Sequence, residues 1–197
     1  MKVVFSLICI MLFAINVHAA GFLPIANIVK IRGSAFINGE EVREGAEVAR
    51  GMEIKIPKKG DYLIIKYQNG HKVRFTEALV KVEELTEKSS LLSIFKGQVH
   101  TLVNKLTPDE KFVIKTKYAS FGVRGTKFGI IVDEKKKKSY LCVCEGTVAA
   151  TQGELTAEVH KNEDLWVGAN AKKLDVKEST PQMFNATNGI LKEMEAL

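Results

Sequence analysis

The side chains most often used in catalysis and metal binding are sparse in this 197-residue sequence. Three of the four histidines, His71, His100 and His160, follow the first 19 residues and lie far apart along the chain. None has the spacing to a second His, Cys or carboxylate that metal ligands show. Exposed or partly buried positions on strands explain all three without a metal.

Two of the three cysteines, Cys142 and Cys144, are two residues apart in a segment of extended character. Side chains at this spacing on a strand point to the same face. The pair could bind a soft metal, but it lacks the two-residue gap and the second ligand pair of a zinc site. A disulfide between them would distort the strand. We therefore expect two small, reduced residues buried in a core.

Four consecutive lysines, Lys135, Lys136, Lys137 and Lys138, lie between two segments with strong strand patterns. A solvated hairpin loop is the simpler interpretation of such a run. The same lysines could also touch an acidic lipid or polymer. Elsewhere, we find no Gly-x-Ser-x-Gly elbow, no phosphate-binding loop and no pair of carboxylates suited to acid–base chemistry. The sequence therefore favours a protein that is not an enzyme and uses no cofactor.

The most informative segment, residues 115–128, joins two predicted strands through an arginine between two glycines. Its glycines allow backbone angles or close approaches that other residues do not. The arginine can donate several hydrogen bonds to carbonyls that would otherwise be unpaired, which predicts a structural crossover. The alternative is an anion site built from the arginine and the glycine amides. The residues concerned are Gly122, Val123, Arg124, Gly125, Thr126 and Phe128.

The elements around this segment alternate between apolar and other residues with a period of two, which is typical of half-buried strands. Turn signals such as Asn38-Gly39, Asn69-Gly70 and Gln152-Gly153 separate the runs. The pattern predicts an all-β protein, either a twisted sandwich or a short β-solenoid of about a dozen strands. Only the end of the chain has helical character. Thr180 is a candidate cap, Pro181 a candidate first residue, and Asn188-Gly189 a predicted break or kink.

The N-terminus has the layout of a secretory signal peptide, with a positive start at Lys2, an apolar run, and a small-residue cleavage site between Ala19 and Ala20. The apolar run is shorter than the roughly 20 residues of a membrane-spanning helix. An uncleaved N-terminal anchor is the other interpretation. Removal of Lys2 lowers the formal charge from +6 to +5. Because this mild excess is spread among acidic residues, we expect no nucleic-acid partner.

Residues 121–128, Phe-Gly-Val-Arg-Gly-Thr-Lys-Phe, resemble the signature of the FecR-domain family, named after the iron-dicitrate transport regulator. Residues 29–35, 63–75, 94–99 and 143–148 resemble other family segments in the same order. The resemblance covers about residues 25–150 and implies a wound, solenoid-like all-β domain. Lys117 stands where the family usually has Pro.

The resemblance implies a domain that relays signals by contact. Regulators of this family also have a cytoplasmic segment that contacts a sigma factor, a transmembrane helix and a second α/β subdomain, none of which we recognise here. We expect a signal peptide (1–19), a FecR-type domain (20–178) and a short helical tail (179–197). The expected function is a stand-alone sensor or binding module, periplasmic or secreted, whose partner is another envelope protein and whose mature chain has no transmembrane segment. The alternative is a structural component that binds cell-wall polymer or lipid. The oligomeric state is left open.

Overall fold

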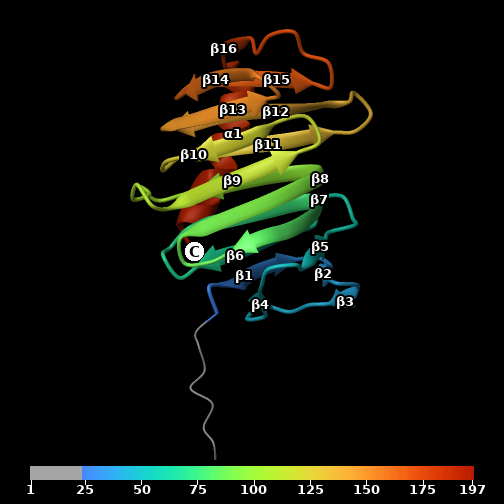
Figure 1. The fold of residues 1–197 in the computed structure, drawn as a ribbon. Coiled ribbons are helices and arrows are strands. Elements are labelled where there is room, and N and C mark those ends of the chain that lie inside the picture. The colour runs from blue at the N-terminus through green and yellow to red at the C-terminus, as the bar shows by residue number, and fades with distance from the viewer. Residues whose placement is uncertain (1–23) are drawn as a thin grey trace, which may run out of the picture.

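The computed structural model describes residues 24–197, which form sixteen strands and one helix. Figure 1 shows the strands stacked along one long axis in approximate chain order, with the helix lying against one side of the stack. The predicted all-β fold is confirmed. In the described part of the chain, no helix is long and apolar enough to cross a membrane.

The strands range from short bridges near the start of the chain to two long central strands. They are β1 (Ala26–Arg32), β2 (Phe36–Ile37), β3 (Glu40–Glu41), β4 (Glu47–Val48), β5 (Glu53–Lys55), β6 (Tyr62–Tyr67), β7 (Lys72–Leu85), β8 (Ser89–Leu102), β9 (Lys111–Thr116), β10 (Ser120–Val123), β11 (Lys127–Asp133), β12 (Lys138–Glu145), β13 (Thr147–Gln152), β14 (Leu155–His160), β15 (Glu163–Gly168) and β16 (Val176–Glu178).

The strands form two layers that share β7 and β8. One layer, here called the open layer, has the order β3-β2-β5-β7-β8-β9-β10-β13-β14. The other, here called the covered layer, has the order β4-β1-β6-β7-β8-β11-β12-β15-β16. After β8 the chain adds antiparallel pairs of strands to the two layers in turn. The sandwich and the solenoid expected from the sequence are therefore combined, because the chain winds up a two-layered stack.

Bends in the two long strands carry them from one layer to the other. The pairing of β7 with β8 changes register between Thr76 and Leu79, where Glu77 has a φ of +48°. Opposite it, Gly97 has a φ of +95°, and a Cβ at this position would lie 2.4 Å from the Glu77 carbonyl oxygen. Only glycine fits so close to another backbone. This contact fixes the place where the layers meet.

Alternate residues of both layers point inward and form the main core. One row across the covered layer consists of Leu63, Phe75, Val99, Ile130 and Leu141, each fully buried. Their neighbours along each strand point to the opposite face, as a two-residue period requires. The period therefore predicted correctly which side chains are buried together.

Helix α1 (Pro181–Glu195) packs on the outer face of the covered layer, over β8, β11 and β12. The Thr180 hydroxyl accepts the Met183 amide at 3.4 Å, and Pro181 lies in the first turn, both as predicted. The predicted break at Asn188-Gly189 is wrong, because the helix continues to Glu195. Leu191 and Met194, beyond the glycine, are buried against the sheet. This burial offsets the helix-breaking tendency of glycine, which costs about 1 kcal/mol.

The C-terminal end of α1 lies over basic side chains of the covered layer. Lys72 Nζ donates to the Met194 carbonyl at 2.8 Å, and Lys127 Nζ lies 2.9 Å from a Glu195 carboxylate oxygen. Arg74 pairs with Glu193 at 3.0 Å. Cations at this end of a helix complement the partial negative charge of its unpaired carbonyls. The predicted tail is thus attached to the sheet through both apolar and polar contacts.

Candidate functional site

The sequence predicted that the glycine–arginine segment forms a crossover between two strands. In the structure these two strands belong to different layers. Gly122 and Val123 end β10 in the open layer, and Phe128 lies on β11 in the covered layer. Val123 and Phe128 are buried in the main core, so the segment is held at both ends. Arg124, Gly125 and Thr126 make the link between the two strands.

The crossover lies against two other chain segments. Gly125 has a φ of +112°, as expected for a special glycine, and a Cβ there would lie 2.7 Å from the Lys105 Cα. On the other side, Gly146 approaches so closely that an added Cβ would lie 2.6 Å from the Gly125 carbonyl oxygen. The Val103 amide donates to the Thr126 carbonyl at 2.9 Å. Glycine is required here because three backbones meet.

The role predicted for the arginine within this crossover is wrong. The Arg124 side chain is exposed, and within residues 24–197 its guanidinium makes no hydrogen bond or ion pair. Backbone amides take its place: the Val103 amide reaches the Thr126 carbonyl, and the Leu106 amide lies 3.5 Å from the carbonyl oxygen of Arg124. Since the loop supplies these donors, the guanidinium is left free to contact something outside the chain.

Beside Arg124, the outer face of the open layer is hollowed into a groove of about 700 Å³. Its floor is a row across four paired strands, formed by Val113, Gly122, Ala149 and Glu158. Gly122 has no positive φ, and a Cβ there would meet nothing within 4 Å. The hollow therefore arises because Gly122 and Ala149 are small and adjacent.

The rim of this groove carries charges of both signs. Lys111 and Arg124 lie on it together with Glu110. Glu158 brings a carboxylate from β14, the last strand of the open layer. The groove can thus offer hydrogen bonds and ion pairs around a partly apolar floor. This composition is suited to the binding of a polypeptide or an anionic group.

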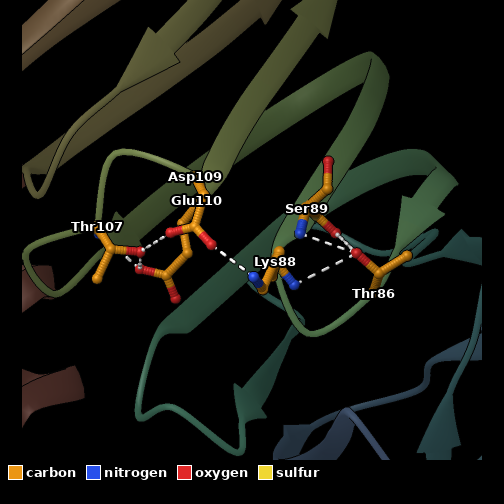
Figure 2. Close-up of polar contacts among 6 residues, drawn as sticks. All are labelled: Thr86, Lys88, Ser89, Thr107, Asp109 and Glu110. Atoms are coloured by element: carbon orange, nitrogen blue, oxygen red, sulfur yellow. Dashed lines mark hydrogen bonds and ion pairs between the residues drawn. The ribbon is translucent and has the colours of Figure 1, made fainter.

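One wall of the groove is a loop whose shape is fixed by polar contacts (Figure 2). The Thr107 amide donates to a Glu110 carboxylate oxygen at 2.7 Å, and the Thr107 hydroxyl lies 2.6 Å from Asp109 Oδ1. Lys88, in the turn between β7 and β8, reaches Asp109 Oδ2 at 2.5 Å. The hydrogen bond from Lys88, followed by that from Thr107, lowers the pKa of Asp109 to about 2. The loop is therefore tied to the turn beside it in a charged network.

Figure 2 also shows the contacts of Thr86, Lys88 and Ser89 that hold this turn. The Thr86 hydroxyl accepts the Ser89 amide at 2.9 Å and the Lys88 amide at 3.3 Å. The Lys88 carbonyl accepts the Lys111 amide at 2.7 Å. Side-chain hydroxyls commonly organise turns in this way. The groove wall is therefore preformed.

Part of this chain matches a known protein family. Residues 58–149 match the family described as FecR protein.

This chain carries a FecR domain.

The FecR match begins just before β6 and ends within β13. It includes the crossover and every residue of the groove floor except Glu158. No match was found among curated proteins.

Two crystal structures from Parabacteroides distasonis, each described as a candidate anti-sigma factor, are similar to this chain. The first has 19% sequence identity and a TM-score of 0.59, and the match covers 68% of this chain and 63% of that one. The second has 16% identity and a TM-score of 0.47, covering 77% of this chain and 63% of the other. The present chain thus spans less than two thirds of those proteins. The first likeness shows that the two chains share a fold.

The FecR domain keeps both described cysteines reduced and buried between β12 and α1, as the sequence predicted. Cys142 Sγ lies 3.5 Å from Ser179 Oγ. The hydrogen bond from Cys144 lowers the pKa of Cys142, to about 6, whereas the same bond and burial raise the pKa of Cys144. Within residues 24–197, no three His, Cys, Asp or Glu side chains gather as metal ligands.

Two histidines are more buried than the sequence indicated. His71 accepts the Asn104 amide at 3.2 Å on Nδ1. His100 lies on the covered layer below α1, and its Nδ1 atom has no partner in the described part of the chain. Burial, assisted by Arg74, lowers the pKa of His100 to about 3. His160 is exposed, as one of the expected positions.

The predicted cleavage site between Ala19 and Ala20 lies outside the described residues.

Sequence reasoning missed most of the groove. Lys111 and Val113 had the right spacing to share an outer strand face, which was the available signal. Nothing local placed Gly122 beside Ala149, because their adjacency arises from pairing between β10 and β13.

Proposed function

We propose that this protein is a non-catalytic binding module of the bacterial envelope, which acts by contact with another envelope protein. The match of residues 58–149 to the FecR family is the observation that carries the proposal. The similar fold of a protein described as a candidate anti-sigma factor adds support for a regulatory role. The signal-peptide pattern that ends near Ala19 supports export to the periplasm.

The proposed contact surface combines the groove with the neighbouring edge of the open layer. Strand β14 ends this layer, and in the described chain only β13 pairs with it. An unpaired edge offers amides and carbonyls to an added strand. Because Glu158 belongs both to β14 and to the groove floor, a strand added there would extend the floor.

Arg124 is the anchor we assign to this surface. Its guanidinium is exposed beside the groove and has no partner in residues 24–197. Arginine forms planar, paired hydrogen bonds with carboxylates, which Lys111 cannot reproduce. We infer that a carboxylate of the partner binds here. The remaining motif residues, including Gly125 and Thr126, serve to hold the crossover.

The test is crosslinking in living cells followed by mass spectrometry, comparing the wild type with two variants of β14. Successive amides of an edge strand point alternately toward and away from its neighbour. Of Thr156→Pro and Ala157→Pro, one therefore removes an outward donor and leaves the pairing with β13 intact. We expect a recurrent partner protein that this variant loses while remaining folded. A partner retained by both variants excludes strand addition. Absence of any recurrent partner, with only cell-wall defects in a deletion strain, contradicts the proposed function.

A further inference from the structure

A group of lysines lies on one side of the stack, away from the groove. They come from three segments: the turn after β9, the hairpin between β11 and β12, and the loop between β15 and β16. All but Lys138 are exposed. We call this group the lysine face, and it consists of Lys117, Lys135, Lys136, Lys137, Lys138, Lys172 and Lys173.

The three segments meet in space although they are distant in sequence. Ser139 Oγ donates to Thr116 Oγ1 at 2.9 Å, which joins the start of β12 to the turn after β9. The Ala169 amide donates to the Lys137 carbonyl at 3.3 Å, which joins the β15–β16 loop to the hairpin. Figure 1 shows the hairpin and the later loop projecting from the same side of the stack. Their lysines therefore form one surface.

The lysine face has an excess of positive charge that its neighbours do not neutralise. Lys136 pairs with Asp133 at 3.5 Å, and Lys173 pairs with Asp175 at 3.2 Å. Within residues 24–197, no ion pair involves the other exposed lysines of the face, which are Lys117, Lys135, Lys137 and Lys172. A surface of this kind attracts anionic partners over roughly 10 Å at moderate salt.

An exposed tryptophan lies within this charged surface. Trp166 is 42% exposed, and Lys138 Nζ lies 4.0 Å from the centroid of its ring. On β12, Tyr140 packs against the same ring with centroids 4.6 Å apart. The amphipathic ring of tryptophan favours the boundary between lipid headgroups and acyl chains. Exposed lysines beside it match the anionic phosphates of that boundary.

We propose that the lysine face docks this protein on an anionic lipid surface, with Trp166 at the level of the headgroups. The basic side chains of this face are all lysines, which act as point charges on long stems and suit a diffuse array of phosphates. Arg124, the arginine of the groove, lies beyond the opposite end of β10 from the turn that contains Lys117. Docking therefore leaves the groove free. The inference is independent of the proposed protein partner.

Trp166 is the only tryptophan of the chain, so its fluorescence reports docking directly. The processed protein, purified from the cells that export it, is titrated with vesicles of equimolar phosphatidylglycerol and phosphatidylethanolamine. Phosphatidylcholine vesicles serve as the uncharged probe. We expect a blue shift and sedimentation with the anionic vesicles only, both reversed at high salt.

The decisive comparison uses two double variants with the same change of charge. Lys135→Gln with Lys137→Gln alters the lysine face, and Lys105→Gln with Lys161→Gln alters exposed lysines outside it. One lysine near an anionic membrane is worth about a five-fold change in affinity, so the first pair should weaken binding about thirty-fold. The second pair should leave binding within about two-fold of the wild type. All four lysines are exposed, so equal urea midpoints verify that both variants are folded.

Three results would overturn the proposal. The first is equal binding to phosphatidylcholine and anionic vesicles. The second is an equal loss of affinity in the two double variants. The third is binding to duplex DNA or purified cell wall that is tighter than binding to anionic vesicles, which would assign the lysine face to another class of partner. None of these results would contradict a protein partner crosslinked through β14, because that partner is proposed for a different surface.

Discussion

Replacement of Gly125 by alanine tests the packing of the crossover most sharply. The new Cβ would require a side chain at a φ of +112° and would lie 2.7 Å from the Lys105 Cα. Strained backbone angles of this kind cost about 1–3 kcal/mol. Because the obstructing atom belongs to a backbone, the relief of the clash costs about 1–3 kcal/mol more. We therefore expect Gly125→Ala to lower the free energy of unfolding by about 2–6 kcal/mol.

Urea denaturation measures this loss. With a slope of about 2 kcal/mol per molar urea, the middle of the usual range, the midpoint should fall by about 1–3 M. Two neighbours provide matched controls. Gly122→Ala meets nothing within 4 Å at an ordinary φ, and Arg124→Ala removes an exposed side chain, so both should stay within about 0.5 kcal/mol of the wild type. The reasoning is refuted if Gly125→Ala is as stable as these controls, or if Arg124→Ala is as damaging as Gly125→Ala.

Three further outcomes are expected. Burial lowers the pKa of His100 to about 3 in the folded state, against about 6.5 in the unfolded state, so the contribution of this residue to stability is complete above pH 6.5 and is lost as the pH falls. Between pH 7 and pH 5 the loss is about 2 kcal/mol. His100→Gln should flatten that part of a plot of unfolding free energy against pH, measured by chemical denaturation. In the processed protein, which lacks Cys9, native Cys142 and Cys144 should resist alkylation because they are buried and reduced. The same protein unfolded without reductant should take two labels, and labels that appear only after reduction would show a disulfide. N-terminal sequencing of the exported protein should begin at or beside Ala20, and an intact start in the cytoplasm would exclude export.

Local patterns were sufficient to predict the strands and their buried faces. The alternation of Phe128, Ile130 and Val132 placed these residues in the main core, where the structure has them. The hairpin around Asn69-Gly70 is also confirmed, since β6 pairs with the first part of β7. Of these two residues only Gly70 has a positive φ, so the turn differs from the two-residue form that requires both.

Features that depend on distant contacts were not accessible from the sequence. The bend at Gly97 results from its approach to the Glu77 carbonyl, which the two-residue period does not reveal. The helix continues past Gly189 because the sheet supplies a surface for Leu191. Arg124 was assigned to buried carbonyls because no local pattern showed that the Val103 and Leu106 amides reach them first. In each case a tertiary contact outweighed the local preference.

The groove is the surface through which the protein is proposed to act. A photoreactive amino acid at Ala149, on the exposed groove floor, tests this claim in living cells. The same group at Lys30, exposed on β1, is the matched control. We predict that the Ala149 probe captures one recurrent envelope protein, that Arg124→Ala abolishes this product, and that the Lys30 probe captures none. Equal products from both probes, or no protein product from Ala149, would contradict the account.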